Sequence, residues 1–266
     1  MRKAPRKSPT SRNLIIQTLS ETLAPLDYVY AMWEGGAVGY GRLDRWSDVD
    51  LYVDAEDKHV KEVFRKVEKA LDSLSAIELR YSVPEAPGQG YSHAFYRLAG
   101  TSKFLLIDLA VFRHSCEDKF LESRIHGRVY FLFNKRNVIK CSTLNKKKLV
   151  RDLRSRKARI QERFDTFGCF VEKEIGRGNW IEALDLYRGL VLDSLVEALR
   201  MRHKPEHHQF KTRYIHYDLP REIVRKLKGL YFVENEEDLK KKHRIAERWL
   251  RKALKEVDLR EVERRL

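Results

Sequence analysis

Residues 34–53, EGGAVGYGRLDRWSDVDLYV, combine a glycine pair with two aspartates that stand one residue apart in an apolar run. The β-rich segment 28–33 precedes the glycines, and apolar residues alternate with polar or amphipathic ones over residues 48–54. This alternation predicts a strand, so Asp48 and Asp50 leave the same face of it. Two carboxylates held that close repel each other, and one pKa rises unless a cation lies beside them. The stretch therefore predicts a strand that carries a cation site.

The residue types around the aspartate pair favour a magnesium–nucleotide complex. Magnesium is commonly held by one or two carboxylates, water and substrate phosphate oxygens. Gly35 and Gly36 follow a strand directly and permit a tight turn, in which backbone N–H groups can approach a phosphate. The alternative is a half-exposed strand on which Asp48 caps a turn and Asp50 is solvated. For a lone Asp-x-Asp that alternative is favoured, so the choice depends on the surrounding motif.

The chain changes character near residue 143. The N-terminal part alternates helical and extended patterns, with helices predicted at 13–23 and 56–74 and strands at 28–33, 48–54, 76–82, 93–98, 104–112 and, more weakly, 128–133. The C-terminal part is helical, with long patterns at 149–175 and 180–202, shorter helices from 220 and a last helix at 238–257. The predicted division is a basic flexible tail (1–12), a mixed α/β domain (13–143) and a helical domain (144–266).

Composition and charge favour a globular protein with anionic partners. Apolar residues make up 42% of the 266 residues and charged residues 35%, and the formal net charge of +15 favours nucleic acid, nucleotide phosphates or an anionic membrane surface. The alternative is a solvated Lys/Arg-rich surface. The basic runs are dispersed along the chain, which disfavours a dedicated nucleic-acid groove.

The chain also lacks the sequence features of membrane or secreted proteins. No stretch approaches the roughly 20 apolar residues that span a bilayer, and no apolar signal region follows the basic segment MRKAPRKSPTSR. The three cysteines are widely spaced, without metal-type pairing, so we expect reduced thiols. We predict a cytoplasmic protein without membrane contact.

The glycine and aspartate motifs together resemble a known signature. EGG at 34–36, a short spacer and SDVDLYV at 47–53 resemble the signature of the DNA polymerase β-like nucleotidyltransferase superfamily. The layout is similar to that of the stand-alone aminoglycoside and lincosamide nucleotidyltransferases. The resemblance implies an α+β fold, with a mixed-sheet nucleotidyltransferase domain at 13–143 and a C-terminal all-helical bundle at 144–266. It also implies that Asp48 and Asp50 bind magnesium.

Asp108 is the predicted third carboxylate of the site. It interrupts the apolar run FLLIDLAVF at 104–112, and a buried carboxylate without a partner is costly. Asp108 therefore needs a cation, and the alternative to a metal is a salt bridge to an arginine. The resemblance implies that Asp108 is a third metal-site residue and the base that takes the proton from the attacking hydroxyl. His93 begins a strand that can neighbour that of Asp108; it either contacts the site or, the reading we favour, is an ordinary strand-end histidine.

The motif departs from the superfamily pattern in its phosphate-binding part. Many members carry an arginine a few residues after the glycine, and here the nearest is Arg42, with Arg45 a weaker substitute. Gly36 occupies a position where serine is frequent, so one phosphate hydrogen bond has to come from the backbone. We expect Gly35, Gly36, Arg42 and Arg45 to contact the triphosphate. Arg188 in the helical half is a weak candidate for contact with the leaving pyrophosphate.

The resemblance implies a magnesium-dependent nucleotidyltransferase with a two-metal site. It would move a nucleoside monophosphate from an NTP, with ATP favoured, to a hydroxyl of a small-molecule acceptor and release pyrophosphate. Two alternatives stay open. In the first, the acceptor is an RNA end or a protein, which the net charge allows. In the second, the chain is a catalytically silent nucleotide or nucleic-acid binder.

The histidine-rich segment RHKPEHHQF offers a weaker metal-binding pattern. His203, His207 and His208 have spacing into which zinc ligands can be read. Pro205 disfavours a continuous helix there, and no acidic or cysteine cluster completes the set. We therefore expect a basic, polar loop near the cleft.

Overall fold

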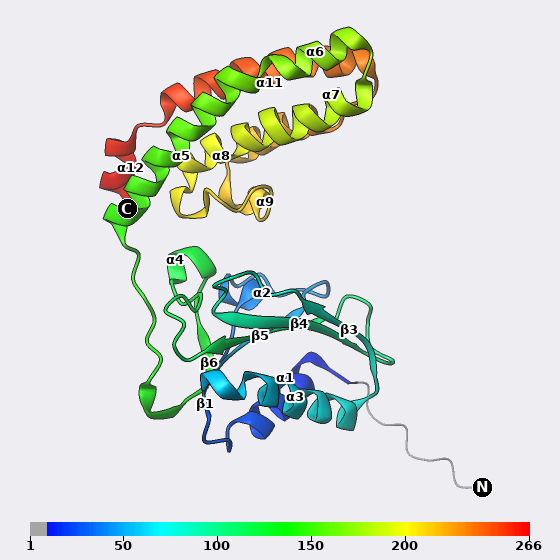
Figure 1. Ribbon diagram of the computed structural model, residues 1–266, viewed down its shortest axis with the longest axis vertical. Coiled ribbons are helices and arrows are strands. Elements are labelled where there is room, and N and C mark those ends of the chain that lie inside the picture. The colour runs from blue at the N-terminus through cyan, green and yellow to red at the C-terminus, as the bar shows by residue number, and fades with distance from the viewer. Residues whose placement is uncertain (1–9) are drawn as a thin grey trace, which may run out of the picture. The chain divides into compact units, whose positions relative to one another are not determined.

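The computed structural model describes residues 10–266 and divides into two compact units, Met1–Thr143 and Leu144–Leu266. The first unit holds a six-stranded mixed sheet with helices, and the second is built from helices, which confirms the predicted α+β class (Figure 1). We expect a flexible tail at residues 1–12, and positions 1–9 of it lie outside the described residues. Arg12 opens helix α1 (Arg12–Leu23), and the Ser11 hydroxyl caps that helix by accepting from the Leu14 N–H at 3.3 Å.

All six predicted strands are present, with boundaries shifted by a few residues. They are β1 (Val29–Glu34), β2 (Val49–Ala55), β3 (Ile77–Val83), β4 (Tyr91–Leu98), β5 (Ile107–Arg113) and β6 (Tyr130–Asn134). Their order in the sheet is β3-β4-β5-β2-β1-β6, and β2 pairs with β5 in parallel while the other pairs are antiparallel. The parallel pair therefore lies at the centre of the sheet.

The alternation in β2 sorts its side chains between two faces. Val49, Leu51 and Val53 are fully buried in a core shared with helix α1 and helix α3 (Val60–Leu74). Both helices cover one side of the sheet, whereas the short helices α2 (Gly36–Gly39) and α4 (Ser123–His126) lie on the other side (Figure 1). Because side chains alternate along a strand, the polar residues of β2 face the α2–α4 side.

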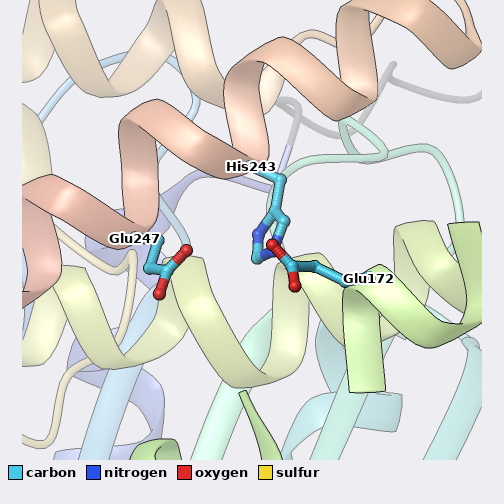
Figure 2. A group of neighbouring side chains, drawn as sticks. All are labelled: Glu172, His243 and Glu247. Atoms are coloured by element: carbon cyan, nitrogen blue, oxygen red, sulfur yellow. The ribbon is translucent and has the colours of Figure 1, made fainter. Parts of the chain in front are cut away.

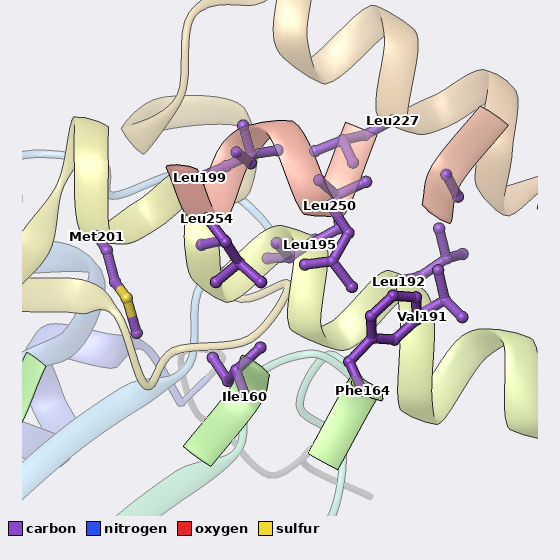
Figure 3. Close-up of a cluster of buried hydrophobic side chains, with 14 of the residues drawn as sticks. Ile160, Phe164, Val191, Leu192, Leu195, Leu199, Met201, Leu227, Leu250 and Leu254 are labelled. Carbon is purple, nitrogen blue, oxygen red and sulfur yellow. The ribbon is translucent and has the colours of Figure 1, made fainter. Parts of the chain in front are cut away.

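The second unit is a set of packed helices. They are α5 (Lys146–Phe167), α6 (Cys169–Arg177), α7 (Trp180–Leu186), α8 (Asp193–His203), α9 (Ile215–Asp218), α10 (Arg221–Tyr231), α11 (Glu236–Glu256) and α12 (Leu259–Arg265), with a π-type turn over Tyr187–Leu192 between α7 and α8. Figure 3 shows part of their common core, in which Ile160 and Phe164 of α5 lie near Leu195 of α8 and Leu250 of α11. The apolar stripes of separate helices meet here, as amphipathic helices of a globular protein do.

Helix boundaries differ from the predicted ones where local backbone details decide. The pattern predicts one helix over 149–175, but α5 and α6 meet at Gly168, where an added Cβ would lie 2.6 Å from the carbonyl oxygen of Phe164. Glycine allows this close backbone approach. Helix α5 also begins earlier than predicted, because the Asn145 side chain caps it by accepting from the Lys148 N–H at 2.9 Å. In the described part of the chain, no helix combines the length and apolarity that a bilayer crossing requires.

Candidate functional site

Strand register brings Asp50 and Asp108 together at the centre of the sheet. Their Cα atoms are direct partners across the parallel pair β2–β5, and neighbouring strands lie about 4.8 Å apart. Asp50 is 6% exposed, whereas the Asp108 side chain is 23% exposed. Asp48 directly precedes β2 and is half-buried, and its carbonyl oxygen accepts from Nη2 of Arg12 at 3.3 Å. Paired residues on adjacent strands share a face, so Asp50 and Asp108 both lie on the α2–α4 side.

The glycine pair lies directly against the polar face of β2. A Cβ added at Gly36 would be 1.7 Å from Oδ2 of Asp50, and one added at Gly35 would be 2.5 Å from the Tyr52 ring. Gly36 also has a φ of +57°, a conformation that L side chains rarely adopt. The Gly35 N–H donates to the Asp50 carbonyl oxygen at 3.2 Å. Glycine is required at Gly36 on both counts, conformation and space.

His93 of β4 contacts Asp108, so the strand-end interpretation that we favoured is wrong. Its Nε2 lies 2.5 Å from Oδ1 of Asp108, because β4 pairs with β5 and places His93 opposite Ala110. An ionised carboxylate only accepts hydrogen bonds, so Nε2 carries the hydrogen when Asp108 is charged. The side chain that contacts Asp108 is thus a histidine and not an arginine. Burial, and then the negative charge of Asp108, raise the pKa of the nearby Tyr91 phenol.

The two candidate phosphate-binding arginines follow the glycines on one turn, on which Arg42 is half-buried and Arg45 is exposed. The Arg42 guanidinium lies 4.9 Å from the centre of the Tyr40 ring, and its backbone N–H donates to the Ala37 carbonyl oxygen at 2.8 Å. The Arg45 guanidinium lies 4.4 Å from the centre of the Trp46 ring and is exposed. Both cations are therefore stacked on aromatic side chains of the turn that joins the glycine pair to β2. Arg188, the helical candidate, is exposed.

A second buried aspartate on the same strand has a different environment. Asp54 is fully buried, with His114 Nδ1 at 2.7 Å from Oδ2 and Lys119 Nζ at 3.5 Å from Oδ1. Lys119 also donates to the carbonyl oxygens of His114 and Cys116. Burial raises the pKa of Asp54, although the contacts with His114 and Lys119 oppose that shift. Asp54 belongs to an internal ion-pair network that holds the loop after β5 against the sheet.

The donor set at the aspartates suits a hard cation. Magnesium takes oxygen ligands, and Asp48, Asp50 and Asp108 offer carboxylates at or beside neighbouring strand positions. Gly36 packs directly against the Asp50 carboxylate, at a position that no side chain could share. Among residues 10–266, however, the one group of three potential ligands whose atoms all lie within 4.8 Å of one another is Glu172, His243 and Glu247 in the helical unit. The three aspartates share a location but are not a group of this compactness.

The histidine-rich connection is buried and structural, so the predicted polar loop is wrong. His207 is 1% exposed, and its Nδ1 lies 2.8 Å from Oδ2 of Asp218, which also pairs with Arg200 at 2.6 Å. His208 is 6% exposed and donates from Nδ1 to the Pro205 carbonyl oxygen at 2.9 Å. The polar residues of this segment thus take part in a buried hydrogen-bonded network, because a buried polar group needs a partner.

Sequence reasoning missed the group formed by Glu172, His243 and Glu247. Its members come from two helices that are far apart along the chain, so no continuous sequence motif indicates them. The available signal was local: His243 and Glu247 are four residues apart in the predicted helix 238–257 and therefore share one face. Pairing that face with Glu172 required the packing of α6 against α11.

Comparisons with known proteins find little. A scan against protein-family models finds no match, and a comparison with curated proteins finds none either. Among solved structures, an aminoglycoside 6-adenyltransferase from Bacillus subtilis is similar over 93% of this chain and 90% of its own, with 12% sequence identity and a TM-score of 0.35. A similarity at this level carries no argument about activity, so the functional inference depends on the site itself.

Proposed function

We propose that the chain is a magnesium-dependent nucleotidyltransferase that moves a nucleoside monophosphate from an NTP to a hydroxyl of a small-molecule acceptor. The observation that carries this proposal is the register of Asp50 with Asp108 on adjacent parallel strands, with Gly36 packed against the Asp50 carboxylate. This arrangement joins the two parts of the motif that resembles the nucleotidyltransferase superfamily. The small-molecule acceptor follows from the similarity of the layout to the stand-alone enzymes.

Asp48, Asp50 and Asp108 would hold the metal. Two carboxylates on adjacent strand positions of one face repel each other, and a divalent cation between them relieves that repulsion. When bound, magnesium would neutralise phosphate charge and align the attacking and leaving oxygens. The partial exposure of Asp108 leaves this carboxylate accessible from the α2–α4 side.

The glycine turn and Arg42 would bind the triphosphate. The Gly35 N–H is used by the Asp50 carbonyl oxygen, so a phosphate would take its backbone hydrogen bonds from Gly36 onward. The absence of a side chain at Gly36 lets a phosphate approach the backbone closely. Arg42 and Arg45 follow on the same turn and would supply positive charge. The guanidinium group of an arginine can also make a bidentate contact with phosphate oxygens. This assignment keeps all four predicted nucleotide-contacting residues.

Asp108 and His93 would handle the proton of the acceptor. The acceptor oxygen forms a bond to the α-phosphorus, the bond from that phosphorus to the bridging oxygen breaks, and pyrophosphate leaves with the electron pair. The hydroxyl proton passes to the Asp108 carboxylate, which His93 orients through its hydrogen bond to Oδ1. Positioning and charge stabilisation supply most of the rate in such transfers, so the residues need no unusual reactivity.

Nucleotide titration tests this proposal. We expect calorimetry to detect binding of at least one of ATP, GTP, CTP and UTP in magnesium, loss of that binding in EDTA, and loss in Asp48→Asn without a change in unfolding temperature. Steep weakening of acceptor binding with added salt would indicate an RNA acceptor instead of a small molecule. If no nucleotide binds the wild-type chain in magnesium, the proposed function is wrong.

A further inference from the structure

Three potential metal ligands converge between two helices of the second unit. Figure 2 shows the imidazole of His243 and the carboxylate of Glu247, one turn apart on α11, together with the carboxylate of Glu172 from α6. One ligand atom from each side chain lies within 4.8 Å of the other two. The two helices come from segments that are far apart along the chain, so packing of the unit, and not local sequence, assembles this group.

His243 has an environment that is unusual for a buried histidine. It is 2% exposed, and neither Nδ1 nor Nε2 has a hydrogen-bond partner. Its ring packs edge-on against the Tyr187 ring, with centroids 6.2 Å apart, while the Tyr187 hydroxyl is already used by the Leu230 carbonyl oxygen at 3.0 Å. Buried polar atoms in native proteins are nearly always hydrogen-bonded or bound to an ion, so two unpaired ring nitrogens beside two carboxylates point to a metal-binding site.

The protonation state of His243 suits metal binding. Burial lowers the pKa of the imidazole below its ordinary 6.5, and the nearby Arg244 acts in the same direction. The carboxylates of Glu247 and Glu172 oppose this shift and are weaker than burial. The neutral imidazole is therefore favoured near pH 7, and it is the neutral ring that offers a lone pair to a metal ion.

We propose that Glu172, His243 and Glu247 bind a divalent first-row transition-metal ion, with Zn²⁺ as the representative ion. One imidazole nitrogen and two carboxylate oxygens are zinc ligands, and a nitrogen donor disfavours magnesium and calcium. Two carboxylates and a neutral imidazole carry a charge of about −2. Arg251 offsets about one of these charges through its ion pair with Glu247, and a divalent ion more than balances the remainder. Three protein ligands leave a fourth position for water.

Small side-chain movements would complete the coordination. Ligand atoms around a tetrahedral zinc lie about 3.3 Å apart, given metal–ligand distances of roughly 2.0–2.1 Å. Glu172 is exposed and can rotate toward the other two ligands. Arg251 donates to Oε1 of Glu247 at 3.1 Å, so Oε2 would be the oxygen that binds the ion. The site would cross-link α6 to α11, and it is independent of the proposed transferase activity.

Zinc titration of the full chain in excess magnesium tests this assignment. The excess magnesium occupies sites that consist of carboxylates alone. Zinc binding therefore reports on sites that include a nitrogen ligand. We expect one equivalent of Zn²⁺ to bind, and at a free concentration of about 100 times Kd the unfolding temperature should rise by roughly 5–10 °C. Co²⁺ should bind in its place with an absorption spectrum of a low-coordinate nitrogen- and oxygen-ligated ion.

Two variants and one control decide the outcome. Glu172→Gln changes an exposed side chain and should fold normally, yet lose the zinc-dependent rise in unfolding temperature. His243→Gln should lose the Co²⁺ spectrum as well. Glu182→Gln, an exposed carboxylate on α7, should behave as wild type. If no zinc binds, or if Glu172→Gln binds zinc with wild-type affinity, the assignment is overturned.

Discussion

Asp50 and Asp54 stand four residues apart on the same face of β2, and both are buried, yet their surroundings differ. Asp54 lies between His114 and Lys119, two groups of this chain that can carry positive charge, at 2.7 and 3.5 Å. Asp50 lies beneath a glycine and beside a second aspartate, Asp108, in register. The same residue type thus has two different environments along one strand. Under the proposed function, Asp54 holds the fold together and Asp50 binds the metal, and their neighbours, not burial alone, distinguish them.

The contrast extends to what covers each carboxylate. The loop that follows β5 closes over Asp54 and supplies Lys119, which is 7% exposed. The turn that follows β1 passes over Asp50 with a residue that has no side chain, Gly36. One end of the strand is therefore covered by a charged side chain, and the other by the backbone of a glycine. Four substitutions or conditions separate the two ends.

The largest expected effect is that of Gly36→Ala. A positive φ costs an alanine about 1–2 kcal/mol, and overlap of its Cβ with Asp50 adds roughly 1–3 kcal/mol. Gly41→Ala is the matched control, because its φ is +65° with no atom within 4 Å of the added Cβ. Chemical denaturation should show the larger loss for Gly36→Ala, and calorimetry should show lost magnesium–nucleotide binding for that variant alone. Equal losses would contradict the close packing of Gly36 on Asp50.

Lys119→Met should destabilise the other end of the strand. Removing one partner from a buried ion pair typically costs about 3 kcal/mol or more, because the remaining charge stays buried. The exposed Lys140→Met serves as control and should change the free energy of unfolding little. Denaturation in urea measures both variants. Folded Lys119→Met should bind magnesium–nucleotide with wild-type affinity, and a weakened affinity would mean that the two ends of the strand are not separate.

His93→Phe should have an intermediate effect that is confined to the Asp50 end. The hydrogen bond to Oδ1 orients the Asp108 carboxylate, and loss of such a supporting contact weakens metal binding by about tenfold. His93→Gln keeps a donor and should recover part of the affinity. Magnesium titrations in the presence of nucleotide compare the three proteins. Identical magnesium affinities in all three proteins would mean that His93 does not support metal binding.

The smallest expected effect is a pH dependence at Asp54. Burial raises the pKa of this carboxyl above its ordinary 3.8, against the opposing effect of His114 and Lys119. The native state therefore holds the proton more tightly than the unfolded chain, and the resulting stability is present below about pH 3.8 and lost as pH rises through the native pKa. The free energy of unfolding of wild type minus that of Asp54→Asn should fall over this window. A rise would mean that the ion pairs outweigh burial.

Local sequence patterns were enough to predict the strands and the turn that carry the candidate site. Alternation identified β2, the glycine pair identified the turn after β1, and a single acid in an apolar run identified Asp108. These features are legible because strand periodicity and glycine conformation act over a few residues. The α+β class follows from the same patterns, since extended segments precede helical ones along the chain.

Contacts that depend on strand pairing or helix packing were beyond such patterns. The contact of His93 with Asp108 requires β4 to lie beside β5, and β4 follows a loop whose sequence does not specify its partner. The His114–Asp54–Lys119 network requires the loop after β5 to fold back on the sheet. Tertiary packing also buries His207, which its polar neighbours made look exposed. Long-range pairing decides each of these.

Titration of Mg-ATP into wild type, Asp50→Asn and Asp54→Asn measures whether the Asp50–Asp108 pair binds the metal and nucleotide. The two variants change the same residue type, to the same amide, on the same face of one strand. We predict that Asp50→Asn loses magnesium-dependent nucleotide binding, while Asp54→Asn keeps it at reduced stability. Retained binding in Asp50→Asn, or equal loss in both variants, would contradict the assignment of the Asp50–Asp108 pair as the nucleotide-metal site.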